Sequence, residues 1–160
     1  MSRPLEGIRV ADFSHVFAGP IASYFLALLG AEVIKVENPG VGDGMRNYGG
    51  DRRYFGMSPH FMGANGGKKS IAVDLKHPEG NEIARKLIAS CDVVIENLRP
   101  GAMRKMGLGY DDARTLREDI IYCSISGYGQ TGPKRDFPAI DNIVQASSGM
   151  VSLSEDEGSY

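Results

Sequence analysis

The sequence has 160 residues, of which 42% are hydrophobic and 24% charged, and its formal net charge at pH 7 is −2. This length fits one domain with a proper core and excludes a disulfide mini-protein or a large multidomain machine. The near-neutral charge argues against nucleic acid or an anionic membrane as a partner, and the longest apolar segment, residues 21–29, is too short to cross a bilayer.

Short apolar strands alternate with helices in the first part of the chain. Residues 7–13 form a β-branched run that predicts a buried strand. Residues 21–29 are rich in Ala and Leu and predict a helix that starts at Pro20 and ends at Gly30. A second strand is expected at residues 31–37 after a very short connection, as in α/β units.

Residues 38–69 interrupt this alternation. They hold nine of the 21 glycines and show little periodicity, which predicts a long functional loop. Its aromatic residues argue against disorder. The remaining predicted elements are a strand at residues 70–75, a helix starting at Pro78, a strand at 91–96, helices at 102–106 and 111–117, a strand at 120–126 and a last helix at 140–150.

This order predicts an α/β fold, a Rossmann-like parallel sheet with helices on both faces. In such sheets ligands bind at the carboxyl ends of the strands. After the first predicted strand, residues 14–20 lead into a helix N-terminus, whose free amides favour an anion. The bulky Val16 and Phe17 leave no room for a dinucleotide pyrophosphate, so this is not a standard NAD site. His15 fits either a structural or a functional role at this position.

Cations gather after the fourth and third predicted strands. Arg99, Arg104 and Lys105 lie within seven residues after strand 91–96, and Lys76 follows strand 70–75. These side chains either neutralise phosphate groups or form a solvated face. Lys68 and Lys69 are expected to be a further solvated pair.

Other common site types are not predicted. The three histidines have no metal-ligand spacing, and no GxSxG or Walker A motif occurs. Cys91 and Cys123 lack CxxC spacing, so we expect reduced thiols in a cytoplasmic protein.

Several segments, in order along essentially the whole chain, resemble the family III coenzyme A (CoA) transferases. The matching segments are residues 5–13, 18–20, 29–37, 68–76, 96–101, 107–110, 126–133 and 141–149. The resemblance implies transfer of CoA between an acyl-CoA and a carboxylic acid through an enzyme-bound aspartyl anhydride and thioester. It also implies a Rossmann-like large domain, a small domain, an interlocked homodimer, and acyl-CoA as substrate with no tightly bound cofactor.

Family positions that contact CoA map onto the strand ends of this chain. They are His15, Val16, Phe17, Ala18, Asn38, Val73, Lys76, Asn97, Leu98, Lys105 and Met106. Some members carry an arginine at the position of Asn38, so this residue is expected to be a weaker phosphate contact.

The family nucleophile, an aspartate in a Gly-Asp motif, is expected beyond residue 160. Asp156 lies in an acidic run without that motif and is not assigned this role. Residues 1–160 therefore resemble the amino-terminal part of the large domain, without the small domain and the carboxyl-terminal return, and are expected to be inactive alone. Two alternatives remain: an α-methylacyl-CoA racemase, disfavoured because Ile140 replaces a histidine base before Asp141, and a non-catalytic CoA-binding module.

Overall fold

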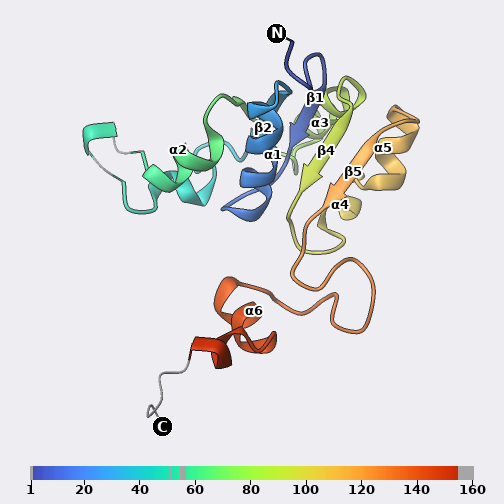
Figure 1. Cartoon of the computed structure of the whole chain (residues 1–160). Coiled ribbons are helices and arrows are strands. Elements are labelled where there is room, and N and C mark those ends of the chain that lie inside the picture. The colour runs from blue at the N-terminus through green and yellow to red at the C-terminus, as the bar shows by residue number, and fades with distance from the viewer. Residues whose placement is uncertain (1, 51, 55–56, 155–160) are drawn as a thin grey trace.

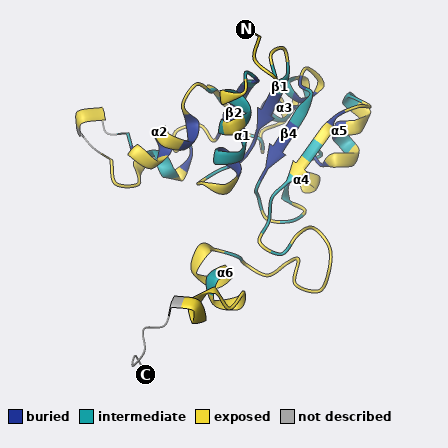
Figure 2. Cartoon of the chain, in the orientation of Figure 1, coloured by how far each residue is buried: buried dark blue, intermediate teal, exposed yellow. Residues whose placement is uncertain are grey.

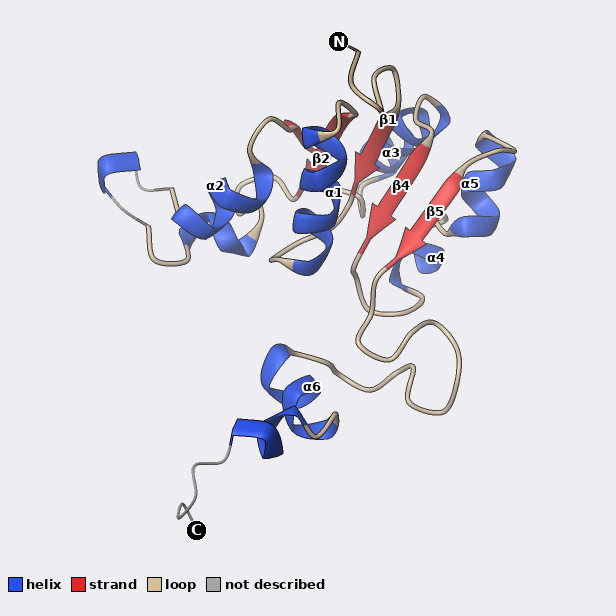
Figure 3. Cartoon of the chain, in the orientation of Figure 1, coloured by secondary structure: helices blue, strands red, loops and turns tan. Residues whose placement is uncertain are grey.

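The structure, a computed structural model, describes residues 2–50, 52–54 and 57–154; Asp156 lies outside them. Its centre is a sheet of five parallel strands in the order β3-β2-β1-β4-β5 (Figures 1 and 3). The strands are β1 (Arg9–Asp12), β2 (Glu32–Glu37), β3 (Lys69–Ala72), β4 (Val93–Glu96) and β5 (Ile121–Ser124). This confirms the predicted parallel sheet. The strand order reverses between β1 and β4, so the crevice where ligands bind in such folds lies between their carboxyl ends.

Helices cover both faces of the sheet, as predicted (Figure 3). The helices are α1 (Ala18–Leu28), α2 (Pro59–Asn65), α3 (Pro78–Ala89), α4 (Ala102–Lys105), α5 (Tyr110–Leu116) and α6 (Asp141–Ser147). Side chains of β1 alternate between the two faces. Ala11 joins the larger core with Ile88 of α3, whereas Val10 joins a smaller core with Leu26 of α1. The central strands β1 and β4 are accordingly mostly buried (Figure 2).

The segment between β2 and β3 is more ordered than expected. Helix α2 lies within residues 38–69, preceded by short 3-10 helices at Gly44–Asn47 and Arg52–Tyr54. The Ser58 hydroxyl accepts a hydrogen bond from the His60 N–H, and Pro59 occupies the first helical turn. The prediction that residues 38–69 form a loop without helices or strands was wrong, because a seven-residue helix is too short to show periodicity.

Three predicted boundaries also shift. Helix α1 begins at Ala18, before Pro20, and β3 ends at Ala72 because the chain turns at Asp74, whose carbonyl accepts from the His77 N–H. The last helix ends at Ser147 and is followed by a 3-10 helix at Met150–Ser154.

Residues 126–154 extend away from the sheet and carry α6 below it (Figure 1). Several apolar side chains are exposed on this arm and elsewhere, among them Ile140 on the arm and Phe25 and Leu28 on α1. In the described part of the chain, no helix has the length and hydropathy needed to cross a membrane. Cys91 is buried and Cys123 exposed, and both are free thiols.

Candidate functional site

The chain between β1 and α1 makes a tight turn at residues 14–17, here called the 14–17 turn. Val16 has a φ of 68°, and it is the only described residue besides glycine with a positive φ. Left-handed backbone is unfavourable for a β-branched side chain, because Cβ crowds the following carbonyl oxygen. The conformation of the 14–17 turn therefore has to be imposed by its surroundings.

Side chains from three strand ends hold the first half of this turn. The Ser14 N–H and hydroxyl donate to the buried Asp12 carboxylate, and the Lys35 ammonium donates to the Ser14 carbonyl at 2.6 Å. Asn97, after β4, both accepts from the His15 N–H at 2.7 Å and donates to the His15 carbonyl at 2.8 Å. The amide of Asn97 thus joins β1 to β4 across the crevice.

Asp43, in the segment after β2, holds the second half of the turn. Its carboxylate oxygens accept from the Val16 N–H at 3.1 and 3.2 Å and pair with the Lys35 ammonium at 2.9 Å. The side chains of Lys35 and Asp43 are 1% and 0% exposed. Burial opposes ionisation of Asp43, but hydrogen bonds from the Met45 N–H and from Lys35 outweigh it and keep the pKa of this carboxyl below its usual value.

A second buried ion pair lies beneath the turn. The Lys68 ammonium is 3.0 Å from the Asp12 carboxylate and also donates to Ser23, Asn65 and the Pro20 carbonyl at 2.8 Å each. The expectation that Lys68 is solvated was wrong: its side chain is 2% exposed, and burial lowers its pKa below the usual value. The ammonium neutralises the charge of Asp12, and its hydrogen bonds tie β1 and α1 to the end of α2.

Lys69 behaves as expected for a solvated residue. Its side chain is 70% exposed and pairs with Glu32 at the surface.

A cavity of about 530 Å³ opens beside the turn, between the segment after β4 and the chain after β5. Its lining comprises Asn97, Leu98, Arg99, Pro100, Ala102, Lys105, Ser126, Gly127, Arg135, Asp136, Phe137, Pro138, Ala139 and Ile140. The wall on the sheet side combines the apolar Leu98 with the exposed cations Arg99 and Lys105. This arrangement suits a ligand with both apolar and anionic parts.

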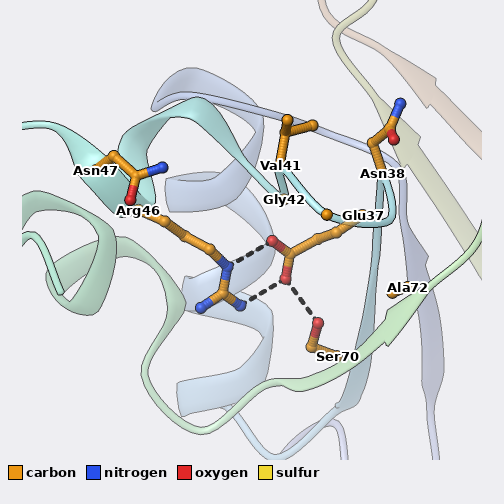
Figure 4. A pocket seen from close by; sticks show the side chains of 9 residues that line it. Glu37, Asn38, Val41, Gly42, Arg46, Asn47, Ser70 and Ala72 are labelled. Atoms are coloured by element: carbon orange, nitrogen blue, oxygen red, sulfur yellow. Dashed lines mark hydrogen bonds and ion pairs between the residues drawn. The ribbon is translucent and has the colours of Figure 1, made fainter. Parts of the chain in front are cut away.

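A second cavity of about 350 Å³ lies at the carboxyl ends of β2 and β3 (Figure 4). Arg46 forms two hydrogen bonds of 2.7 Å with the Glu37 carboxylate, which also accepts from the Ser70 hydroxyl at 2.6 Å. Burial opposes ionisation of Glu37, but Arg46, Ser70 and the Asp43 N–H outweigh it and lower the pKa of this carboxyl to about 2. The Asn38 amide points away from this pair (Figure 4). The Glu37–Arg46 pair is neutral as a unit, so this cavity has little attraction for an anion.

His15 is half-buried at the start of the turn. Burial, followed by the nearby Lys35 ammonium, lowers the pKa of His15 below its usual 6.5. This shift favours the neutral imidazole.

The structure brings most of the proposed CoA contacts to one edge of the sheet. His15, Val16 and Phe17 lie between β1 and α1, Ala18 is the first residue of α1, and His15 is hydrogen-bonded to Asn97. Leu98 and Met106 pack against the larger core, of which Val73 is a member. Because Val73 is only 6% exposed, its side chain offers little surface to a ligand.

The predicted phosphate-binding cations are free to meet a ligand. Lys76, Arg104 and Lys105 are exposed, and within the described residues none of them pairs with a carboxylate. Asn81 donates to the Met106 carbonyl at 2.7 Å, which keeps the segment around Lys76 near α4. Asn38 lies apart from these residues, in the second cavity.

Sequence reasoning missed the residues that hold the site together, Lys35, Asp43 and the Glu37–Arg46 pair. A signal for Lys35 was present: it lies on the same face as Val33, in a strand whose two faces were both expected to be buried. No comparable signal marked Asp43, since it lies in a glycine-rich segment without periodicity.

Comparison with known proteins decides the family. The model of CoA-transferase family III matches residues 5–160. The chain belongs to CoA-transferase family III. It is 48% identical to succinyl-CoA:glutarate CoA-transferase of Mus musculus and 40% identical to formyl-CoA:oxalate CoA-transferase of Rhodopseudomonas palustris. These matches cover 97% and 95% of this chain but 35% of each relative, so the chain spans about a third of their length.

Solved structures agree with this family III assignment. A CAIB/BAIF family protein from Brucella suis superposes with a TM-score of 0.92 at 36% identity, covering 99% of this chain and 43% of that one. A hypothetical protein from Mycobacterium tuberculosis superposes with a TM-score of 0.88 at 41% identity, covering 98% and 43%. The sheet and its helices are thus the fold of the corresponding part of these proteins.

Proposed function

We propose that this chain is the CoA-binding, amino-terminal part of an enzyme that transfers CoA between an acyl-CoA and a carboxylic acid. The observation that carries the proposal is the family match over residues 5–160. The crevice between β1 and β4 supports it, because it combines an apolar surface with unpaired cations at the edge where α/β folds bind ligands.

The residues of this chain would divide the recognition of CoA among them. Lys76, Arg104 and Lys105 would neutralise the phosphate groups, and Leu98 and Met106 would contact the adenine and pantetheine parts. The first amides of α1 have no side-chain cap and would add partial positive charge on the same side.

The covalent steps would require a nucleophilic aspartate beyond residue 160. Its carboxylate oxygen would attack the acyl carbonyl, the C–S bond would break, and the CoA thiolate would leave to give an anhydride. Attack of this thiolate on the aspartyl carbonyl would release the donor acid and form an enzyme thioester. The acceptor carboxylate would then attack this thioester, giving a new anhydride and free CoA thiolate. Attack of the thiolate on the acceptor's acyl carbonyl would give the new acyl-CoA and regenerate the aspartate. Splitting one transfer into such steps lowers each barrier.

The names of the relatives suggest which substrates to test first. The relatives from Mus musculus, Homo sapiens and Agrobacterium fabrum, at 46–48% identity, are named for succinyl-CoA or succinate and glutarate. We propose a dicarboxylic acid as acceptor and succinyl-CoA as donor. The assay is CoA exchange by the full-length protein, followed by chromatography of the acyl-CoA products, with hydroxylamine added to trap the anhydride or thioester.

An α-methylacyl-CoA racemase is the alternative enzyme activity to be tested against this proposal. Ile140 is exposed and has no group that accepts a proton, so the second base expected at this place is missing. Exchange of the α-proton of a 2-methylacyl-CoA into solvent, without CoA exchange between acids, would establish a racemase. CoA binding without either reaction would establish a non-catalytic module.

We further propose an interlocked homodimer in the cytoplasm. Exposed apolar side chains on α1 and α6 support a partner chain, and the unpaired thiols of Cys91 and Cys123 fit a reducing compartment.

The CoA site is tested by titrating CoA into the full-length protein by calorimetry. The double variant Lys76→Ala/Lys105→Ala is expected to weaken binding at least tenfold, since two phosphate contacts are lost. Lys86→Ala is the matched control, because Lys86 is an exposed cation on α3 that pairs only weakly with Glu82. Unchanged affinity in the double variant would show that these lysines are merely solvated.

A further inference from the structure

The 14–17 turn is held more firmly than a connection between a strand and a helix requires. Four backbone polar groups of the turn bond to side chains from elsewhere in the chain: the carbonyl of Ser14 accepts from Lys35, the N–H and carbonyl of His15 bond to Asn97, and the Val16 N–H donates to Asp43. All three partners come from other parts of the sheet edge, and Lys35 and Asp43 are fully buried.

The same turn presents its side chains outward. Val16 and Phe17 are 53% and 52% exposed, although both are large and apolar. A residue such as glycine would adopt the left-handed φ of position 16 without strain. The chain instead places a β-branched side chain there and supplies a buried ion pair to hold it, which indicates that the outward valine is needed in this orientation. Strained backbone of this kind concentrates at functional sites.

We propose that Asp43, supported by Lys35, is a positioning residue that holds Val16 in the left-handed conformation so that the 14–17 turn is preformed for CoA. The inference rests on the proposed function. Asp43 acts from beneath the turn through the Val16 N–H and does not itself touch the ligand, because its side chain is fully buried. Lys35 couples the two halves of the turn, since its ammonium contacts both the Ser14 carbonyl and the Asp43 carboxylate.

A purely architectural role for Asp43 makes a different prediction. In that case its loss lowers the stability of the whole fold and leaves the CoA affinity of the folded protein unchanged. The positioning role predicts that loss of Asp43 changes the turn locally and lowers the affinity for CoA. It also predicts that a residue at position 16 that adopts a positive φ without strain restores the affinity.

The experiment uses the full-length protein with Asp43→Asn in three backgrounds: Val16 as found, Val16→Gly and Val16→Ala. Glycine adopts the positive φ freely, whereas alanine also loses the valine side chain but keeps the strain, so Val16→Ala is the matched control. The double variant Asp43→Asn/Lys35→Met removes both charges and leaves no unpaired ion in the core. It replaces Asp43→Asn if the single variant does not fold.

Two readouts separate the possibilities: amide hydrogen exchange followed by NMR, and calorimetric titration of CoA. With Val16 in place, Asp43→Asn is expected to speed exchange of the Val16 amide at least tenfold while Val10 and Val94 keep their rates. It should also weaken CoA binding about tenfold, a factor consistent with the usual cost of strained backbone. In the Val16→Gly background the same substitution should change the affinity less than about threefold, and in the Val16→Ala background it should again weaken binding about tenfold.

The outcomes distinguish this inference from the proposed function. Unchanged exchange at Val16, unchanged affinity, or equal losses in all three backgrounds would each overturn the positioning role. Failure of the unsubstituted protein to bind CoA would overturn the proposed function itself, whatever the exchange rates show.

Discussion

Replacing Gly19 by alanine tests whether the close approach of α1 to the 14–17 turn is required. Gly19 lies in the first turn of α1, and a Cβ built on it would be 2.2 Å from Ser14 Cβ, 2.6 Å from Ser14 Oγ and 3.3 Å from Asn97 Cγ. Neither neighbour can withdraw easily, because Ser14 is hydrogen-bonded to the buried Asp12 and Asn97 to His15. The methyl group therefore has to move the turn or the helix.

The expected change in the free energy of unfolding has the opposite sign to the change that helix propensity alone predicts. A glycine to alanine change inside a helix ordinarily stabilises by roughly 0.5–1 kcal/mol. Overpacking a rigid site costs about 1–3 kcal/mol. We therefore expect Gly19→Ala to lower the free energy of unfolding by about 1–2 kcal/mol, measured by urea denaturation followed by circular dichroism, and to lower the melting temperature by roughly 5 °C.

Gly63→Ala is the matched control in the same chain. Gly63 lies inside α2, and a Cβ there meets no described atom within 4 Å. This variant is expected to be neutral or slightly stabilising. If Gly19→Ala proved as stable as Gly63→Ala, the turn would be pliable and the argument for a rigid, preformed site would be refuted.

Three further predictions concern ion pairs and exposed surface. Lys68→Met should lower the free energy of unfolding by about 3–5 kcal/mol in urea denaturation, because it leaves the buried Asp12 unpaired; Lys69→Met should change it far less, and equal effects would contradict the buried pair. The pKa of Glu37, lowered from 4.5 to about 2, lies below its unfolded value, so its stabilisation is complete above about pH 5 and is lost as the pH falls toward 2. Each pKa unit corresponds to about 1.4 kcal/mol, so on acidification the unsubstituted protein should lose roughly 3 kcal/mol more of its free energy of unfolding than Glu37→Gln does. Parallel pH profiles of the unfolding free energy for the unsubstituted protein and Glu37→Gln would refute this. Residues 1–160 expressed alone should associate in sedimentation velocity and bind a hydrophobic dye, since Phe25 is 57% exposed on α1; a monomer that melts cooperatively would contradict this.

The sequence was sufficient to predict the sheet, because its strands are short apolar runs separated by helices with clear ends. The carboxyl edge was chosen as the place of the candidate site from parallel topology alone. Helix α2 was missed since its seven residues lie among glycines, and its start depends on a serine cap that has no periodic context.

The chemistry that supports the site was much harder to predict than its location. Lys68 and Lys69 are adjacent residues of the same type, yet the side chain of Lys68 is 2% exposed and that of Lys69 is 70% exposed. The difference arises from contacts with Asp12 and Ser23, which are distant in sequence and become neighbours only after the sheet and α1 have formed. Long-range ion pairs of this kind leave no local pattern.

The alignment of β1 with β2 bears on how the chain folds as it leaves the ribosome. Asp12 and Lys35 are opposite each other in the strand register, and their final partners, Lys68 and Asp43, are synthesised later. Because Asp12 and Lys35 have opposite charges, these two groups offset each other before Asp43 or Lys68 emerges. Asp43 and Lys68 then add a second pair of opposite charges, so these four buried groups carry no net charge before the later pair is made or after it is complete.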